Sequence, residues 1–126
     1  SAFRLHRDLG PGLLESAYEA LLAAKLTRMG MRVDRQVPID ARFEDIALPA
    51  AYRVDLLVEQ SIVVEIKSVE RTTPAHAKQV LTYLKLGGFP LGFVINFGTP
   101  MFKEGIKRLI NNTVPLASWR LGANHG

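Results

Sequence analysis

The stretch that decides the fold is YRVDLLVEQSIVVEIK, residues 52–67. Two runs rich in Val, Leu and Ile flank the polar residues EQS at 59–61, and such runs are typical of β-strands. The pattern therefore predicts a β-hairpin that turns at 59–61. Because side chains alternate between the two faces of a strand, pairing the strands outward from this turn places Asp55 directly opposite Glu65.

Asp55 and Glu65 form an unexpected pair for an apolar hairpin. Carboxylates opposite each other on neighbouring strands have Cβ atoms about 4.5–5.5 Å apart and repel each other. A divalent cation would offset this repulsion, and Mg²⁺ prefers carboxylate oxygens and water as ligands. Lys67 lies on the same face as Glu65, where its ammonium could hold a water or stabilise charge on a phosphate. The alternative is a solvated hairpin face with ordinary surface charges, which the apolar residues around the pair disfavour.

Two motifs in the chain resemble those of a nuclease superfamily. Asp55 followed by EIK at 65–67 is similar to the D…(D/E)xK signature of the PD-(D/E)xK nucleases. GLLESAY at 12–18 resembles GxxExxY, the signature of the small GxxExxY family that is usually placed in this superfamily. The similarity covers residues 3–112, and one departure is that Val54 stands where the superfamily name has Pro.

The resemblance implies a metal-dependent phosphodiesterase that acts on DNA or RNA with Mg²⁺ or Mn²⁺. It also implies a restriction-endonuclease-like α/β sandwich, in which helices flank a central mixed β-sheet. By this resemblance Lys67 is the catalytic lysine, and the Ile66 backbone carbonyl is a further metal ligand. The expected metal ligands and catalytic carboxylates are Asp55, Glu65 and Glu15.

The run 13–29 repeats apolar residues with helical spacing and predicts an amphipathic helix. Glu15 falls within its apolar stripe, between Leu22 and Leu26, and a carboxylate on an apolar face needs a partner. If the helix packs across the hairpin, Glu15 points toward the metal site. Tyr18 shares this face, where it either belongs to the core or holds a carboxylate through its hydroxyl.

A second helix is predicted at 74–86, with Thr73 as its N-cap. Gln79 and Tyr83 lie four residues apart and share a face of this helix. They resemble the Q-x-x-x-Y pair that related nucleases often carry on the helix after the ExK strand. The resemblance implies that the pair contacts a substrate phosphate or supports Lys67. The alternative is that Gln79 is a surface residue and Tyr83 a core residue.

The remaining segments complete the α/β sandwich. A helix between the strand that ends at Lys67 and the strand that begins at Leu91 is a crossover, which makes those two strands parallel. Further strands are predicted at 31–38, 40–48, 91–97 and 115–121, and further helices at 2–8 and 101–111.

The composition excludes several classes of protein. The length of 126 residues predicts a single domain over 1–126. No run reaches the ~18 apolar residues that a membrane-spanning helix needs. No cysteine is present, which excludes disulfides and thiolate zinc sites and fits a cytoplasmic protein. The net charge of +4 favours an anionic partner such as nucleic acid.

Two functions therefore compete. The first is the nuclease, which the full acidic set with a lysine favours because a protein that only binds has no need of it. The second is a non-cutting nucleic-acid-binding or regulatory module that keeps the nuclease fold. Small size and the lack of a recognition domain favour this second function. The same two features are also explained if the protein is a nuclease to which a second copy, in a homo-oligomer, or a protein partner supplies specificity.

Overall fold

The computed structural model describes residues 15–69, 73–98 and 105–112, without the side chains at 41–43 and 48–51. The elements there are α2 Glu15–Arg28, β1 Val33–Phe43, β2 Ile46–Val58, β3 Ile62–Lys67, α3 Pro74–Gly87, β4 Leu91–Asn96 and β5 Ile106–Ile110. Neither of these helices is long and apolar enough to cross a membrane. The helix predicted at 2–8 and the strand predicted at 115–121 lie outside the described residues.

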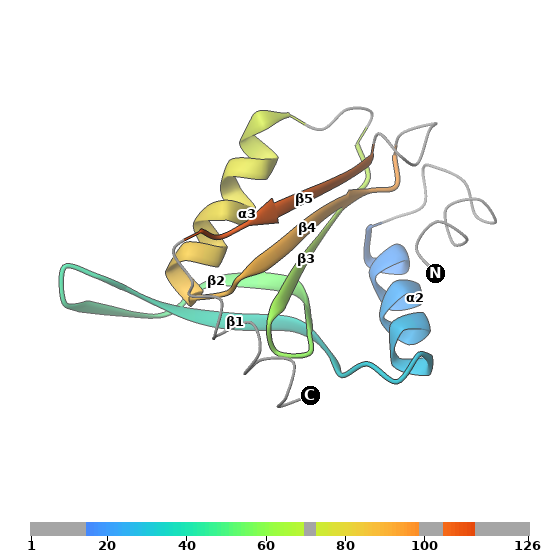
Figure 1. Cartoon of the computed structure of the whole chain (residues 1–126), viewed down its shortest axis with the longest axis horizontal. Coiled ribbons are helices and arrows are strands. Elements are labelled where there is room, and N and C mark those ends of the chain that lie inside the picture. The colour runs from blue at the N-terminus through green and yellow to red at the C-terminus, as the bar shows by residue number, and fades with distance from the viewer. Residues whose placement is uncertain (1–14, 70–72, 99–104, 113–126) are drawn as a thin grey trace.

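The five strands form one mixed sheet with α2 and α3 on opposite sides, which confirms the predicted α/β sandwich (Figure 1). The strand order is β1-β2-β3-β4-β5, and of these neighbours only β3 and β4 run parallel. The crossover helix α3 connects the parallel pair, as the sequence predicted. Gly88, at a φ of 73°, ends this helix in the left-handed region that favours glycine.

Alternation along β3 divides the core between the two faces of the sheet. Val64 packs against α2 in a cluster that includes Tyr18. Val63 projects from the opposite face and packs against α3. Glu65 and Lys67 follow Val63 at alternate positions, so the charged residues of β3 lie on the α3 side.

The predicted hairpin is formed by β2 and β3. Val58 pairs with Ile62, so the turn consists of residues 59–61, as predicted. Its first two residues have φ of 53° and 56°, values that tight turns use to reverse the chain. The same register brings Asp55 and Glu65 to neighbouring positions on two antiparallel strands.

The prediction of separate strands at 31–38 and 40–48 is wrong. β1 runs without a break past Asp40 to Phe43, and β2 begins at Ile46. The chain turns between them at Glu44 and Asp45, whose φ of 49° and 66° match a two-residue hairpin turn. The break in the apolar pattern at Asp40 marks a register shift within the β1–β2 pairing. It is therefore an irregularity inside one long ribbon, which extends to the left in Figure 1.

The helix predicted at 101–111 is a strand where the structure describes it. β5 pairs antiparallel with β4, and Lys107 lies opposite Val94. The apolar residues of IKRLI have a spacing that fits a helix as well as a strand. The free edge of β4 decides in favour of a strand, because its backbone groups need partners. The charged residues of β5 suit an edge strand, since they discourage pairing with another chain.

Candidate active site

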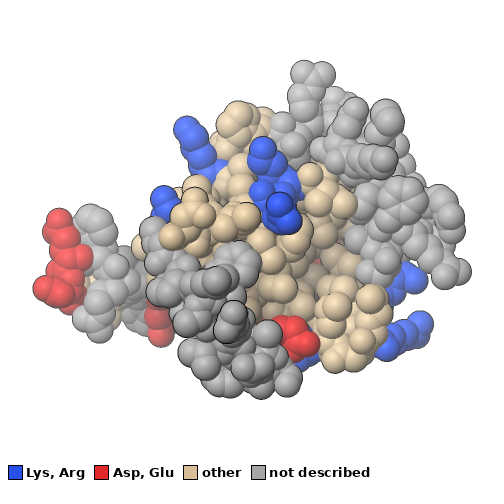
Figure 2. All heavy atoms as spheres, viewed as in Figure 1, with Lys and Arg blue, Asp and Glu red and all other residues tan. Residues whose placement is uncertain are grey.

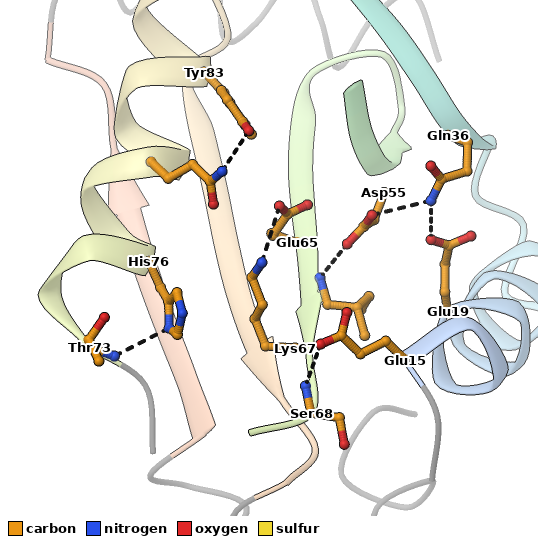
Figure 3. Close-up of polar contacts among 12 residues, drawn as sticks. Glu15, Glu19, Gln36, Asp55, Glu65, Lys67, Ser68, Thr73, His76 and Tyr83 are labelled. Atoms are coloured by element: carbon orange, nitrogen blue, oxygen red, sulfur yellow. Dashed lines mark hydrogen bonds and ion pairs between the residues drawn. The ribbon is translucent and has the colours of Figure 1, made fainter. Parts of the chain in front are cut away.

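Asp55 lies where β2 and β3 separate. Backbone pairing between these strands extends from the turn to Leu56 and Val64. At the next position Asp55 Oδ2 accepts a hydrogen bond from the Ile66 backbone N–H at 2.8 Å (Figure 3). The backbone N–H of a strand residue lies in the plane of the sheet and points toward the neighbouring strand, so the Asp55 carboxylate lies between β2 and β3. The sequence predicted that both carboxylates project from one face; Glu65 does so, whereas Asp55 turns into the gap beside it.

Glu65 is buried on the α3 side of the sheet. The residue is 6% exposed, and its Oε1 has no hydrogen-bond partner among the described residues. Burial, followed by the neighbouring Asp55 carboxylate, raises the pKa of Glu65 from 4.5 to about 8. The Lys67 ammonium, 3.9 Å from Glu65 Oε2, lowers this pKa but does not offset the other two causes. Lys67 alone therefore does not balance the negative charge of the two carboxylates, and a cation between them would.

A chain of hydrogen bonds ties Asp55 to helix α2. Gln36 Nε2 donates to Asp55 Oδ1 at 3.2 Å and also to Glu19 Oε1. Arg35 pairs with the other oxygen of Glu19 at 3.0 Å. Gln36 has a φ of 51°, a conformation that costs about 1–2 kcal/mol for residues other than glycine. Its two side-chain hydrogen bonds offset this cost and hold the Asp55 carboxylate in place.

Glu19 and Gln36 were not among the residues predicted from the sequence. Glu19 is only 5% exposed, although the predicted apolar stripe passed through Tyr18 and not through Glu19. A weak signal existed, because a carboxylate beside a buried stripe must find a partner. No signal existed for Gln36, whose position depends on a backbone conformation that its residue type does not favour.

Glu15 is the first residue of α2 and lies at the end of β3. Its Oε1 accepts a hydrogen bond from the Ser68 N–H at 3.1 Å, one residue beyond Lys67 (Figure 3). Among the described residues, no three Asp, Glu, His or Cys side chains lie close enough together to hold a metal ion. The structure thus brings Asp55 and Glu65 together and places Glu15 at the end of the same strand.

Tyr18 belongs to the core on the α2 side. It is fully buried and stacks on Phe97, with ring centroids 4.1 Å apart. Its hydroxyl makes no hydrogen bond within the described part of the chain. Of the two interpretations of Tyr18, the core position is the one observed.

Tyr83 presents its hydroxyl to the carboxylate pair from α3. Gln79 Nε2 donates to the Tyr83 hydroxyl at 2.8 Å. The Tyr83 ring stacks on Tyr52 at a centroid distance of 4.2 Å, and the Tyr52 hydroxyl donates to the Tyr83 carbonyl at 2.6 Å. Burial, and then the charge of Glu65, raises the pKa of Tyr83. Tyr83 is therefore a neutral hydroxyl, fixed by two partners, next to the acidic residues.

The oxygen donors of this site fit a hard divalent cation. Carboxylate oxygens are the ligands that Mg²⁺ and Mn²⁺ prefer. Glu65 Oε1 is buried without a hydrogen-bond partner in the described part of the chain, and burial beside Asp55 raises the pKa of Glu65. Both features favour the addition of positive charge at this point. Each Asp55 oxygen already accepts one hydrogen bond, but a carboxylate oxygen retains a second lone pair for a cation.

Comparison with known proteins gave one match. A family model described as the PD-(D/E)XK nuclease superfamily matches residues 1–109. No curated protein and no solved structure matches the chain.

Proposed function

Because the chain belongs to the PD-(D/E)XK nuclease superfamily, we propose that it is a Mg²⁺- or Mn²⁺-dependent nuclease that hydrolyses phosphodiester bonds of DNA or RNA. The observation that carries the proposal is the pair of carboxylates, Asp55 and Glu65, which stand side by side with Lys67 next to them. Burial of the Glu65 carboxyl beside a second carboxylate is costly to fold, because burial and like charge both oppose its ionisation. The retention of this pair is explained if it binds a cation.

Asp55 and Glu65 are the side chains that would hold the cation. The Ile66 carbonyl is a third candidate, since a strand residue directs its N–H and its C=O to the same side and the Ile66 N–H points at Asp55. When bound, the ion would polarise a phosphoryl oxygen and lower the pKa of a water. Glu15 would act from the outer shell, through the end of β3 that its carboxylate holds.

Lys67 supplies a positive charge that is fixed beside the reacting phosphate. Its ammonium has three N–H donors and no lone pair, so it cannot bind a metal while it is charged. Lys67 Nζ lies 3.9 Å from Glu65 Oε2 on the α3 face. In that position Lys67 orients the attacking water or stabilises negative charge as it develops on the phosphate.

Gln79 and Tyr83 complete the α3 side of the site. The Tyr83 oxygen accepts its hydrogen bond from Gln79, so the hydroxyl proton remains available for a phosphate oxygen. The raised pKa of Tyr83 keeps that proton in place at neutral pH. We assign Gln79 the role of orienting the hydroxyl and Tyr83 the role of donating to the substrate.

We further infer that the chain belongs to the GxxExxY family within this superfamily. The motif residues at 12–18 include Glu15 and Tyr18. The bond from Ser68 gives the motif Glu a physical role, because it anchors α2 to the strand that carries Lys67. The stacked, buried Tyr18 gives the motif Tyr a packing role in the same contact between helix and sheet.

The test is cleavage of end-labelled single-stranded DNA, double-stranded DNA and RNA with Mg²⁺, with Mn²⁺ and with EDTA. We expect the parent to cut at least one substrate in a metal-dependent way. Glu65→Gln should lose this activity, whereas Glu44→Gln, an exposed carboxylate in the β1–β2 turn, should keep it. A parent that binds Mn²⁺ but cuts none of the substrates would contradict the nuclease and support the non-cutting module.

A further inference from the structure

A second concave feature adjoins the candidate site on the α3 side of the sheet. A cavity of about 370 Å³ lies between the first turns of α3 and strands β4 and β5. Its lining includes Thr73, His76, Ala77, Lys78, Val94 and Lys107.

The pairing of three strands places this cavity directly beside Glu65. Glu65 is the partner of Val94 in the parallel pair, and Val94 is the partner of Lys107 in the next, antiparallel pair. Paired residues share a face of the sheet, so these three side chains form one row under α3. Neighbouring strands lie about 4.8 Å apart, which puts Lys107 on the order of 10 Å from Glu65 along the row. Small residues, Val94 below and Ala77 above, leave the space open.

The cavity is a positively charged pocket with hydrogen-bond donors. Lys78 comes from α3 and Lys107 from β5, and neither ammonium pairs with a carboxylate among the described residues. His76 Nδ1 accepts a hydrogen bond from the Thr73 N–H, so the neutral ring carries its proton on Nε2. No acidic residue is found among the described residues that line the cavity. In Figure 2, Lys and Arg side chains stand over α3 and β5 and also beside α2, while acidic side chains mark the tip of the β1–β2 ribbon.

We propose that this cavity binds a phosphate group of the substrate other than the one that is cleaved. The inference rests on the proposed function, because it takes the scissile phosphate to lie at Glu65 and Lys67. A nucleic-acid strand held there carries further phosphates at regular intervals, and one of them meets Lys107 in the row beside Glu65 and Lys78 on α3. The cavity then fixes the register of the strand and contributes affinity that does not depend on base sequence.

The test is equilibrium binding in EDTA, where no cleavage occurs. A labelled single strand of about twelve nucleotides, as DNA and as RNA, is titrated with the full chain at several salt concentrations and followed by fluorescence anisotropy. Lys107→Gln and Lys78→Gln should each weaken binding by roughly three- to tenfold and reduce the slope of log affinity against log salt by about 1.

Two control variants each remove one positive charge from β5 or α3 at a position outside the cavity. Arg108→Gln changes the neighbour of Lys107 in β5, which pairs with Phe93 and so faces the α2 side. Lys85→Gln changes an exposed residue in the last turn of α3. Both should bind like the parent. The proposal is overturned if Lys107→Gln weakens binding no more than Arg108→Gln does, with all variants folded by circular dichroism.

A comparison of two oligonucleotides, one with a 5′-phosphate and one with a 5′-hydroxyl, identifies which phosphate the cavity binds. An equal loss of affinity for both strands in Lys107→Gln identifies an internal phosphate, and a loss for the 5′-phosphorylated strand alone identifies a terminal one. Either result supports the cavity. The outcome is independent of the nuclease assay: a chain that shows these losses but cuts nothing refutes the proposed function alone, and a chain that cuts but shows none refutes the cavity alone.

Discussion

Glu65 experiences opposing influences that determine its charge at neutral pH. Burial and Asp55 favour the protonated carboxyl, whereas Lys67 favours the carboxylate. The pKa of about 8 means that burial and Asp55 dominate in the metal-free protein. A bound cation reverses this balance, because it favours the carboxylate directly. Metal binding at neutral pH should therefore release a proton from Glu65.

The raised pKa of Glu65 predicts how the stability of the metal-free protein depends on pH. Between pH 4.5 and about 8, Glu65 keeps its proton in the folded state and has lost it in the unfolded state. The free energy of unfolding therefore falls as pH rises through this window. Thermal unfolding in EDTA should show a falling Tm for the parent and for the exposed control Glu44→Gln. Glu65→Gln, which cannot ionise, should lose much of this fall. Identical pH profiles for the parent and Glu65→Gln would contradict the assignment.

The proposed role of Lys67 predicts that its removal affects cleavage but not metal binding. Lys67→Ala should keep Mn²⁺ affinity, or increase it, because the substitution removes a positive charge 3.9 Å from Glu65. Cleavage should fall by ~10²-fold or more if the ammonium acts in the transition state. Titration calorimetry with Mn²⁺ beside the cleavage assay measures both effects, with Lys85→Ala as the control lysine. Unchanged cleavage by Lys67→Ala would show that the catalytic role is wrong.

Helix α2 determines the position of Asp55 through two residues. Glu19 is buried and binds both Arg35 and Gln36, and Gln36 in turn binds Asp55. The exposed pair formed by Arg32 and Asp34 in the same region has no such connection. The two ion pairs should therefore respond very differently when their carboxylates are removed.

Removal of the Glu19 carboxylate should destabilise the protein and weaken the proposed metal site. Glu19→Ala leaves Gln36 and Arg35 without their buried acceptor, which costs about 1–3 kcal/mol in the free energy of unfolding. Asp34→Ala should cost less than about 1 kcal/mol, because exposed ion pairs contribute little. Urea denaturation measures both costs. Mn²⁺ affinity should fall only in Glu19→Ala, and equal costs for the two variants would show that the buried chain of hydrogen bonds does not hold Asp55.

The elements that could be predicted are those fixed by local pattern. The turn at 59–61 and the run of β3 follow from residues that are close in sequence, and the crossover at α3 fixes its parallel neighbours. β5 could not be predicted, because its five residues fit either period and only the free edge of β4 selects the strand. The left-handed conformation of Gln36 could not be predicted either, because it depends on hydrogen-bond partners on α2 and β2.

Across the whole molecule, Asp55 is the point where the two sides of the sheet meet. Gln36 on β1 links Asp55 to Glu19 on α2, while Glu65 and Tyr83 approach Asp55 from the α3 side. The sequence predicted Asp55, Glu65 and Lys67 from the hairpin alone, because their relative positions depend on one register. It could not predict that Glu15 holds the end of the strand, since that contact depends on how α2 packs.

Asp55 and Glu65 are proposed to bind one divalent cation between them. The most direct measurement is a crystal of the protein soaked in Mn²⁺, with data collected to give anomalous difference density. We predict a peak between the two carboxylates, within about 2.0–2.3 Å of at least one oxygen from each, and its loss in Asp55→Ala. An Mn²⁺ peak elsewhere, or no peak between Asp55 and Glu65 at a concentration that supports cleavage, would contradict the account.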